Sequence, residues 1–200
     1  MNSLFHAEPK AVLPYDGTAV LHESFIATRE ADFLFDNLLH EIAWETHQLV
    51  IFGKKVDEPR LSAWIADAGI AYTYSKVLRQ PLPWTKTVGD IRKRVSLAAN
   101  APFNSVLANL YRDGDDAMGW HSDNEPCNGP EPTIASVSFG ATRRFDFRHT
   151  VTKQKVSVFL PHGSLLIMAG RSQEHWQHQI ARTARVSEPR INLTFRNVII

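Results

Sequence analysis

The 200-residue sequence has a single cysteine, Cys127, and no hydrophobic run near the roughly 20 residues that span a bilayer. One cysteine excludes an intramolecular disulfide and a cysteine-rich zinc module, and it is typical of a reducing compartment. The first ten residues show no basic stretch followed by an apolar core, so we expect no secretion signal. Repeats and low-complexity tracts are lacking as well. The sequence therefore predicts one globular domain over residues 1–200, cytoplasmic or, in a eukaryote, nuclear, with no membrane partner.

An excess of either charge is also lacking, because 22 Lys and Arg balance 21 Asp and Glu to a net charge of +1. Such a chain does not bind nucleic acid by bulk charge, which requires many side chains that neutralise phosphates. The charges are nevertheless segregated. Residues 112–131 carry six acidic side chains and one basic, whereas residues 132–200 carry ten basic and three acidic. Two solvated surfaces, or a cation site beside an anion-binding surface, both fit this distribution.

Hydrophobic periodicity divides the chain into two halves. Amphipathic helices are predicted after Thr28, as the N-cap, and after Thr87. Short segments rich in β-formers and separated by Gly and Pro turns follow over 105–112, 134–140, 144–148, 155–160, 164–168 and 191–200. This pattern predicts a mainly β protein, with a sandwich, jelly-roll or barrel core in residues 101–200 and an α/β extension in residues 1–100.

A possible metal site begins at His121-Ser122-Asp123. Side chains at positions i and i+2 of a strand share one face, so this histidine and this carboxylate can meet at one ion. Two surface residues are the simpler interpretation until a third ligand is found. His175 and His178 both supply one, and two histidines with one carboxylate form the facial triad of Fe(II) oxygenases. The HExxH pattern of a zinc-protease helix does not fit this spacing.

The strand predicted near the end has one apolar and one polar face. Its polar face carries Arg190, Asn192, Thr194 and Arg196. An edge strand with one face in water is the simplest interpretation. Two arginines on one face also form a receptor for carboxylates, which arginine binds through two parallel hydrogen bonds. Asn109 and Tyr111, again two residues apart, would add neutral donors for the same acid.

The combination of these motifs resembles the AlkB family of Fe(II)/2-oxoglutarate dioxygenases. The motifs are Asn-x-Tyr at 109–111, His-x-Asp at 121–123, a distal histidine and Arg-x-Asn-x-Thr-x-Arg at 190–196. The resemblance covers most of residues 104–196, including "NLYRDGDDAMGWHSDNEP", "IASVSFGATRRFDFRH" and "RINLTFR", and is closest to the members that act on duplex DNA. It is looser at "VIFGK", "DAGIAYTYS" and "PLPW", and no specific match precedes about residue 45.

The resemblance implies a double-stranded β-helix (jelly-roll) core with flanking α-helices, and an N-terminal extension that forms a nucleotide-recognition lid. It implies three cofactors: Fe(II), 2-oxoglutarate and O₂. The implied Fe(II) ligands are His121, Asp123 and His178, the last being favoured over His175. Arg190 would bind the distal carboxylate of 2-oxoglutarate with help from Asn109, Tyr111 and Asn192, while Arg196 would lie near the iron.

The activity implied is oxidative demethylation of N-alkylated bases in DNA, of the 1-methyladenine and 3-methylcytosine type, with release of formaldehyde, succinate and CO₂. A base inside a duplex must be flipped out to reach such a site. The residues implied to hold it are Tyr72, Tyr74, Ser75 and Glu125. Phe52 would be a wedge that fills the gap left in the duplex. We expect a monomer whose partner is alkylated DNA, with RNA as the alternative.

Other interpretations keep parts of this picture. One is a 2-oxoglutarate oxygenase that acts on RNA, a protein side chain or a small molecule. Another is a non-catalytic jelly roll that uses the triad for structural zinc or binds no metal at all. A structural zinc site, however, needs no carboxylate receptor and is normally four-coordinate. The two tyrosines alone would fit a cross-strand aromatic pair, and Phe52 would fit a buried strand that ends in a glycine turn.

Overall fold

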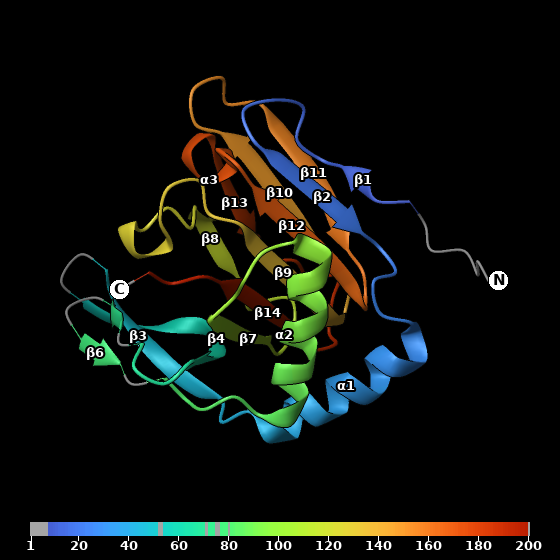
Figure 1. Ribbon diagram of the computed structural model, residues 1–200, viewed down its shortest axis with the longest axis vertical. Helices are drawn as coiled ribbons and strands as arrows, with labels where there is room; N and C mark the ends of the chain where they lie inside the picture. Colours follow the sequence, from blue (N-terminus) through green and yellow to red (C-terminus); the bar gives the residue numbers. More distant parts are fainter. Residues whose placement is uncertain (1–7, 52–53, 71, 75–76, 80, 200) are drawn as a thin grey trace.

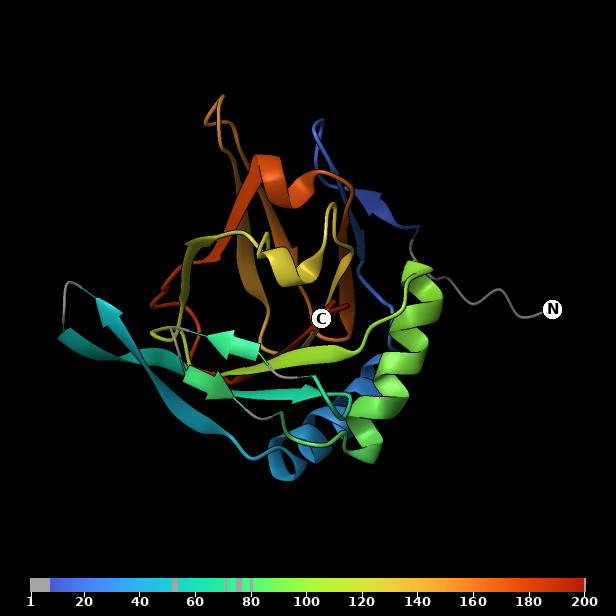
Figure 2. The same ribbon diagram turned by 60° about the vertical axis from the view of Figure 1, so that its left-hand side comes forward.

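Antiparallel strands in two facing sheets form the framework of the protein (Figure 1). The computed structural model describes residues 8–51, 54–70, 72–74, 77–79 and 81–199. The longer helices, α1 (Thr28–Glu41) and α2 (Lys86–Ala99), lie together outside the larger sheet (Figure 2), and the short helices are α3 (Ser172–His175) and the 3-10 helix η1 (Pro126–Asn128). This mainly β jelly roll with flanking helices confirms the predicted fold.

The larger sheet has eight strands, four of which come from residues 10–66. In spatial order they are β1 (Lys10–Ala11), β2 (Thr18–His22), β12 (Ser164–Ala169), β9 (Ile134–Gly140), β14 (Arg190–Arg196), β7 (Ser105–Tyr111), β4 (Lys54–Ala66) and β3 (Glu45–Ile51). The first hundred residues therefore build half of this sheet as well as the two long helices.

The smaller sheet has four strands. In spatial order they are β11 (Lys155–Leu160), β10 (Arg143–His149), β13 (Trp176–Ile180) and β8 (Met118–His121). A separate hairpin joins β5 (Tyr72–Tyr74) to β6 (Val77–Arg79). Buried side chains from both sheets, among them Leu166 of β12 and Phe147 of β10, form the core between them.

Strand β14 lies in the middle of the larger sheet, paired with β7 on one side and β9 on the other. The edge-strand interpretation is therefore wrong. Its apolar residues Ile191, Leu193 and Phe195 are fully buried in the core that includes α1 and α2. Its polar face points toward the smaller sheet and lines a cavity there rather than meeting water. The strand ends at Arg196, earlier than the predicted residue 200.

Both long helices begin earlier than predicted. Helix α1 already includes Thr28; its N-cap is Ala27, and no side chain caps it. Helix α2 is capped by Thr85, whose hydroxyl accepts a hydrogen bond from Val88 N at 3.2 Å. Thr87 lies inside the helix and donates to Glu41 of α1 at 2.7 Å. In the described part of the chain, no helix combines the length and the hydropathy that crossing a membrane requires.

Candidate metal and co-substrate site

The pairing of β8 with β13 brings His121, Asp123 and His178 together between the sheets. His121 ends β8 and is the register partner of His178, and their rings lie 4.2 Å apart. Asp123 lies two residues beyond the end of β8, so the expectation of one continuous strand through both residues is wrong. A hydrogen bond from Asp123 N to Gln173 Oε1 at 2.9 Å holds this segment in place. The three potential ligand atoms lie within 4.8 Å of one another.

The hydrogen bonds of this cluster leave atoms available to a metal ion. His121 Nδ1 lies 2.8 Å from Gly119 O; because a carbonyl accepts, Nδ1 carries the proton and Nε2 has a lone pair. Asp123 Oδ1 accepts from Arg196 Nη2 at 2.7 Å. Asp123 Oδ2 and His178 Nδ1 are buried and have no hydrogen-bond partner among the described residues. The residues present therefore fit a divalent ion that takes nitrogen and oxygen ligands.

The charge states of the cluster also suit metal binding. Burial lowers the pKa of His178 to about 3, and burial lowers the pKa of His121 as well. Burial alone would raise the pKa of Asp123, but the positive charge of Arg196 and the two histidines outweigh it and lower that pKa to about 2. At neutral pH the cluster thus offers two neutral imidazoles and one carboxylate.

These shifts predict a loss of stability in acid for the metal-free protein. The pKa of His178 falls from 6.5 to about 3 on folding. As the pH is lowered, the unfolded chain therefore binds a proton at His178 before the folded chain does. The free energy of unfolding should therefore fall as the pH drops from about 6.5 toward 3. Urea unfolding of metal-free protein at several pH values measures this free energy. His178→Gln should flatten the pH dependence; an unchanged slope would contradict the assignment.

A second cluster, formed by Asp16, His149 and His175, has similar spacing but different hydrogen bonds. His149 Nδ1 accepts from the backbone N–H groups of Val151 and Thr152 at 3.2 and 3.1 Å, so the proton of the neutral ring is on Nε2. Nε2 lies 3.2 Å from Asp16 Oδ2 and donates to it. A protonated nitrogen has no lone pair for a metal. His175 stacks on His149 with ring centroids 5.9 Å apart.

Arg190 lies on the polar face of β14 as an incompletely paired cation. Its Nη2 donates to Ser138 Oγ at 2.9 Å, but Nε and Nη1 are buried without a hydrogen-bond partner among the described residues. Burial lowers its pKa to about 10. Arg143, equally buried, donates instead to three backbone carbonyls. Because a buried cation is costly unless it is paired, Arg190 fits a receptor for a carboxylate that comes from outside the chain.

Four of the five predicted co-substrate residues line one cavity with the His121–Asp123–His178 cluster: Asn109, Tyr111, Asn192 and Arg196. Arg190 lies behind the ring of Tyr111, with its guanidinium carbon 5.2 Å from the ring centroid. The amide group of Asn192 donates to Ser136 Oγ and to Val137 O, and its oxygen accepts from Thr194. Asn192 thus holds strands β14 and β9 together, which leaves less of its amide for a ligand than predicted.

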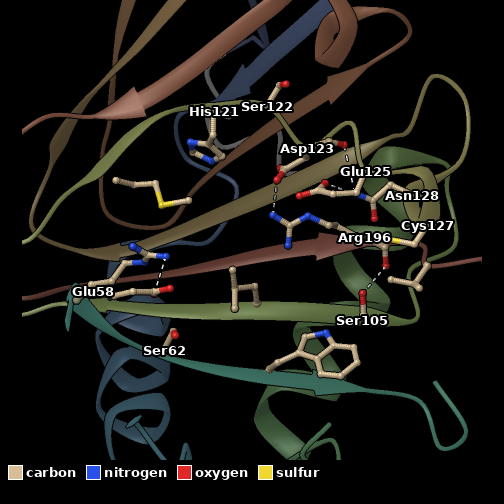
Figure 3. Close-up of a pocket in the computed structure, with 15 residues that line it drawn as sticks. Glu58, Ser62, Ser105, His121, Ser122, Asp123, Glu125, Cys127, Asn128 and Arg196 are labelled. Atoms are coloured by element: carbon tan, nitrogen blue, oxygen red, sulfur yellow. Dashed lines mark hydrogen bonds and ion pairs between the residues drawn. The ribbon is translucent and has the colours of Figure 1, made fainter. Parts of the chain in front are cut away.

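A larger cavity of about 200 Å³ opens beside the cluster (Figure 3). It shares His121, Asp123 and Arg196 with the first cavity and has Glu125 in its wall. Glu125 Oε2 accepts from Asn128 Nδ2 at 3.0 Å, which fixes the position of this carboxylate. Sequence reasoning missed a polar stripe on β4 that lines the same cavity: Glu58, Arg60 and Ser62. Its spacing of two residues was the signal that could have revealed it.

The remaining substrate residues of the sequence-based prediction are placed only in part. Tyr72 and Tyr74 lie on β5, which pairs with β6, but their side chains lie outside the described part of the structure. Ser75 and Phe52 lie outside the described residues altogether. The stacking roles of the tyrosines, the role of Ser75 and the wedge role of Phe52 therefore stay predictions.

Comparisons with known proteins identify the family. The 2OG-Fe(II) oxygenase superfamily matches residues 17–196. Mouse alpha-ketoglutarate-dependent dioxygenase alkB homolog 3 is 37% identical over 188 residues, which are 89% of this chain and 65% of that protein. Human DNA oxidative demethylase ALKBH2 is 41% identical over 182 residues, which are 86% of this chain and 70% of that protein. This chain thus spans just under two thirds of the length of the alkB homolog 3 relative.

A solved structure supports the fold separately. "The structure of OsALKBH1" superimposes with a TM-score of 0.65 at 16% identity, over 94% of this chain and all of that one. The superfamily match, the sequence relatives and the His121–Asp123–His178 cluster agree with one another. The chain belongs to the AlkB family within the 2OG-Fe(II) oxygenase superfamily, whose cofactors are Fe(II), 2-oxoglutarate and O₂.

Proposed function

We propose that this chain removes alkyl groups from bases in DNA by oxidation, acting on lesions of the 1-methyladenine and 3-methylcytosine type. One observation carries the proposal: a cavity of about 200 Å³ adjoins the metal cluster and presents the Glu125 carboxylate beside it. The printed name of the ALKBH2 relatives, DNA oxidative demethylase, supports DNA as the substrate.

The chain's own residues bind and orient the cofactors. His121, Asp123 and His178 would hold Fe(II), and Arg190 would bind the distal carboxylate of 2-oxoglutarate. Phe145, Met168 and Ile180 in the cavity wall would exclude water from the co-substrate. When bound, Fe(II) and 2-oxoglutarate supply, with O₂, the oxidising power that hydroxylates an alkyl carbon. The hydroxymethylated base then loses formaldehyde, and the co-substrate leaves as succinate and CO₂.

In the larger cavity, apolar side chains and the charge of Glu125 would determine how the base binds. A flipped base would enter between apolar side chains, among them Trp64 and Leu107, and reach the metal at His121. The Glu125 carboxylate would accept a hydrogen bond from the exocyclic amino group of adenine or cytosine. A base alkylated on its pairing nitrogen carries a positive charge, which a carboxylate favours over the neutral base.

Contacts to the DNA backbone would come from the outer face of the smaller sheet. Trp120 precedes His121 on β8, and the guanidinium of Arg148 lies 4.4 Å above its ring. Arg148 also donates to Gln177, the neighbour of His178. This arginine of β10 thus holds a positive charge on the face of the smaller sheet opposite to His121 and His178. Phosphate contacts of this kind are few, so binding should be modest and sensitive to salt.

The test is removal of the methyl group itself. Anaerobically purified protein is given Fe(II), 2-oxoglutarate, ascorbate and an oligonucleotide with one 1-methyladenine or 3-methylcytosine, and then air. Mass spectrometry should show an unmodified oligonucleotide, and Asp123→Ala should show none. Succinate release with an intact lesion would point to RNA, a protein side chain or a small molecule as the substrate. Absence of both signals would contradict the proposal.

A further inference from the structure

A buried ion pair that the proposed chemistry does not use lies in the wall of the larger cavity. Glu58 and Arg60 lie two residues apart on β4, and Arg60 Nη2 lies 2.9 Å from Glu58 Oε2. Their side chains are only 5% and 7% exposed. Figure 3 shows Glu58 across the cavity from Glu125, with Arg196 between them. Desolvation cancels much of the attraction in such a pair, so stability alone does not account for it.

Arg60 makes a further contact that leads out of this cavity. Its Nε donates to Asn109 Oδ1 at 2.8 Å. This bond directs the oxygen of the Asn109 amide toward Arg60 and its Nδ2 donor group away from it. Among the described residues, Glu58 and Arg60 line the larger cavity, whereas Asn109 lines the co-substrate cavity. Two polar contacts in series therefore connect a carboxylate at the base-binding cavity with an amide at the co-substrate cavity.

We propose that Glu58 is a positioning residue that couples occupation of the base cavity to binding of 2-oxoglutarate, through Arg60 and Asn109. The inference rests on the proposed function. A positively charged, N-alkylated base in the cavity attracts the Glu58 carboxylate and competes with Arg60 for it. Any shift of Arg60 changes the position of the Asn109 amide and hence the affinity for the co-substrate. By linkage, the co-substrate changes the affinity for the base by the same factor.

The experiment measures this coupling without turnover. Protein loaded with Mn(II) under nitrogen is titrated with 2-oxoglutarate in a calorimeter, alone and with a 3-methylcytosine oligonucleotide or its unmodified counterpart. In the wild type, the methylated oligonucleotide should change the Kd for 2-oxoglutarate by about fivefold or more, and the unmodified one by less. In Glu58→Leu this factor should fall to about one. Because the oxygen of glutamine still accepts from Arg60, Glu58→Gln should retain part of the factor.

The matched control is Glu30→Gln, which breaks the exposed pair of Glu30 with Arg94 and should keep the wild-type factor. Manganese stoichiometry should be the same in all variants, because Glu58 is not a ligand. The inference would be overturned if the methylated oligonucleotide left the Kd for 2-oxoglutarate unchanged in the wild type, or if it changed that Kd in Glu58→Leu as much as in the wild type. If Glu58→Leu does not fold, an unreduced factor in Glu58→Gln overturns it instead. A wild type that binds no 2-oxoglutarate refutes the proposed function and this inference together, whereas normal wild-type binding with full coupling in the variants refutes only the inference.

Discussion

Replacing Arg190 with methionine is expected to weaken the binding of 2-oxoglutarate strongly while metal binding is unchanged. Within the described part of the chain, two buried nitrogens of the guanidinium have no hydrogen-bond partner, and a carboxylate is the group that would pair with them. Losing one partner of a buried charge pair costs about 2–5 kcal/mol, so the Kd should rise by roughly 30-fold to 5,000-fold. Calorimetric titration of the Mn(II)-loaded variant with 2-oxoglutarate measures it.

The stability of the Arg190→Met protein separates a ligand-binding role from a structural one. Methionine removes a buried charge, so the ligand-free variant should be at least as stable as the wild type. Arg144→Met is the control, because Arg144 is exposed and pairs with Asp146 on the outer face of the smaller sheet. It should bind 2-oxoglutarate normally. Wild-type affinity in Arg190→Met would show that the carboxylate binds elsewhere.

Replacing His178 with alanine is expected to prevent metal binding, whereas replacing His175 is not. The two histidines lie three residues apart, but only His178 faces His121 and Asp123. Loss of a residue that merely orients a ligand already weakens a metal site by roughly 10–100-fold, so loss of a ligand should do at least as much. Titration with Mn(II), followed by electron paramagnetic resonance of the free ion, gives affinity and stoichiometry.

The same titration tests the second histidine cluster. We expect one Mn(II) per chain in the wild type and in His175→Ala, because the His149 nitrogen that faces Asp16 carries a proton. Two ions in the wild type, with one lost in His175→Ala, would contradict the hydrogen-bond argument. Metal retained by His178→Ala would contradict the choice of ligands.

The candidate site could be predicted from the sequence where its residues recur at fixed spacing. His121 and Asp123 were found as a pair two residues apart, and Arg190 and Arg196 as two arginines six residues apart on one face of a strand. Choosing His178 over His175 needed the family resemblance, because the register of β13 against β8 is not visible in the sequence. The hydrogen bonds of Asn192 and the link from Arg60 to Asn109 depend on neighbouring strands and could not be predicted.

The fold could be predicted best in the second half, where turns separate apolar strands. Strand β4 was missed because one of its faces lines a cavity. Its alternating polar residues Glu58, Arg60 and Ser62 are therefore buried, whereas an alternating pattern is expected to place polar residues in water. Helix α2 was predicted after Thr87, whereas it begins at Lys86 and is capped by Thr85. The hydrogen bond of Thr87 with Glu41 of α1 depends on the packing of the two helices and could not be predicted.

The most direct test of the central claim measures two products in one reaction. Wild-type protein with Fe(II), 2-oxoglutarate, O₂ and a 3-methylcytosine oligonucleotide should release one succinate for each methyl group removed. Because the residues that would hold Fe(II) adjoin the cavity that would hold the base, the two amounts should rise together. Repaired base and succinate in a ratio near one is the result we predict. Succinate that accumulates while the methylated base stays intact would contradict the account.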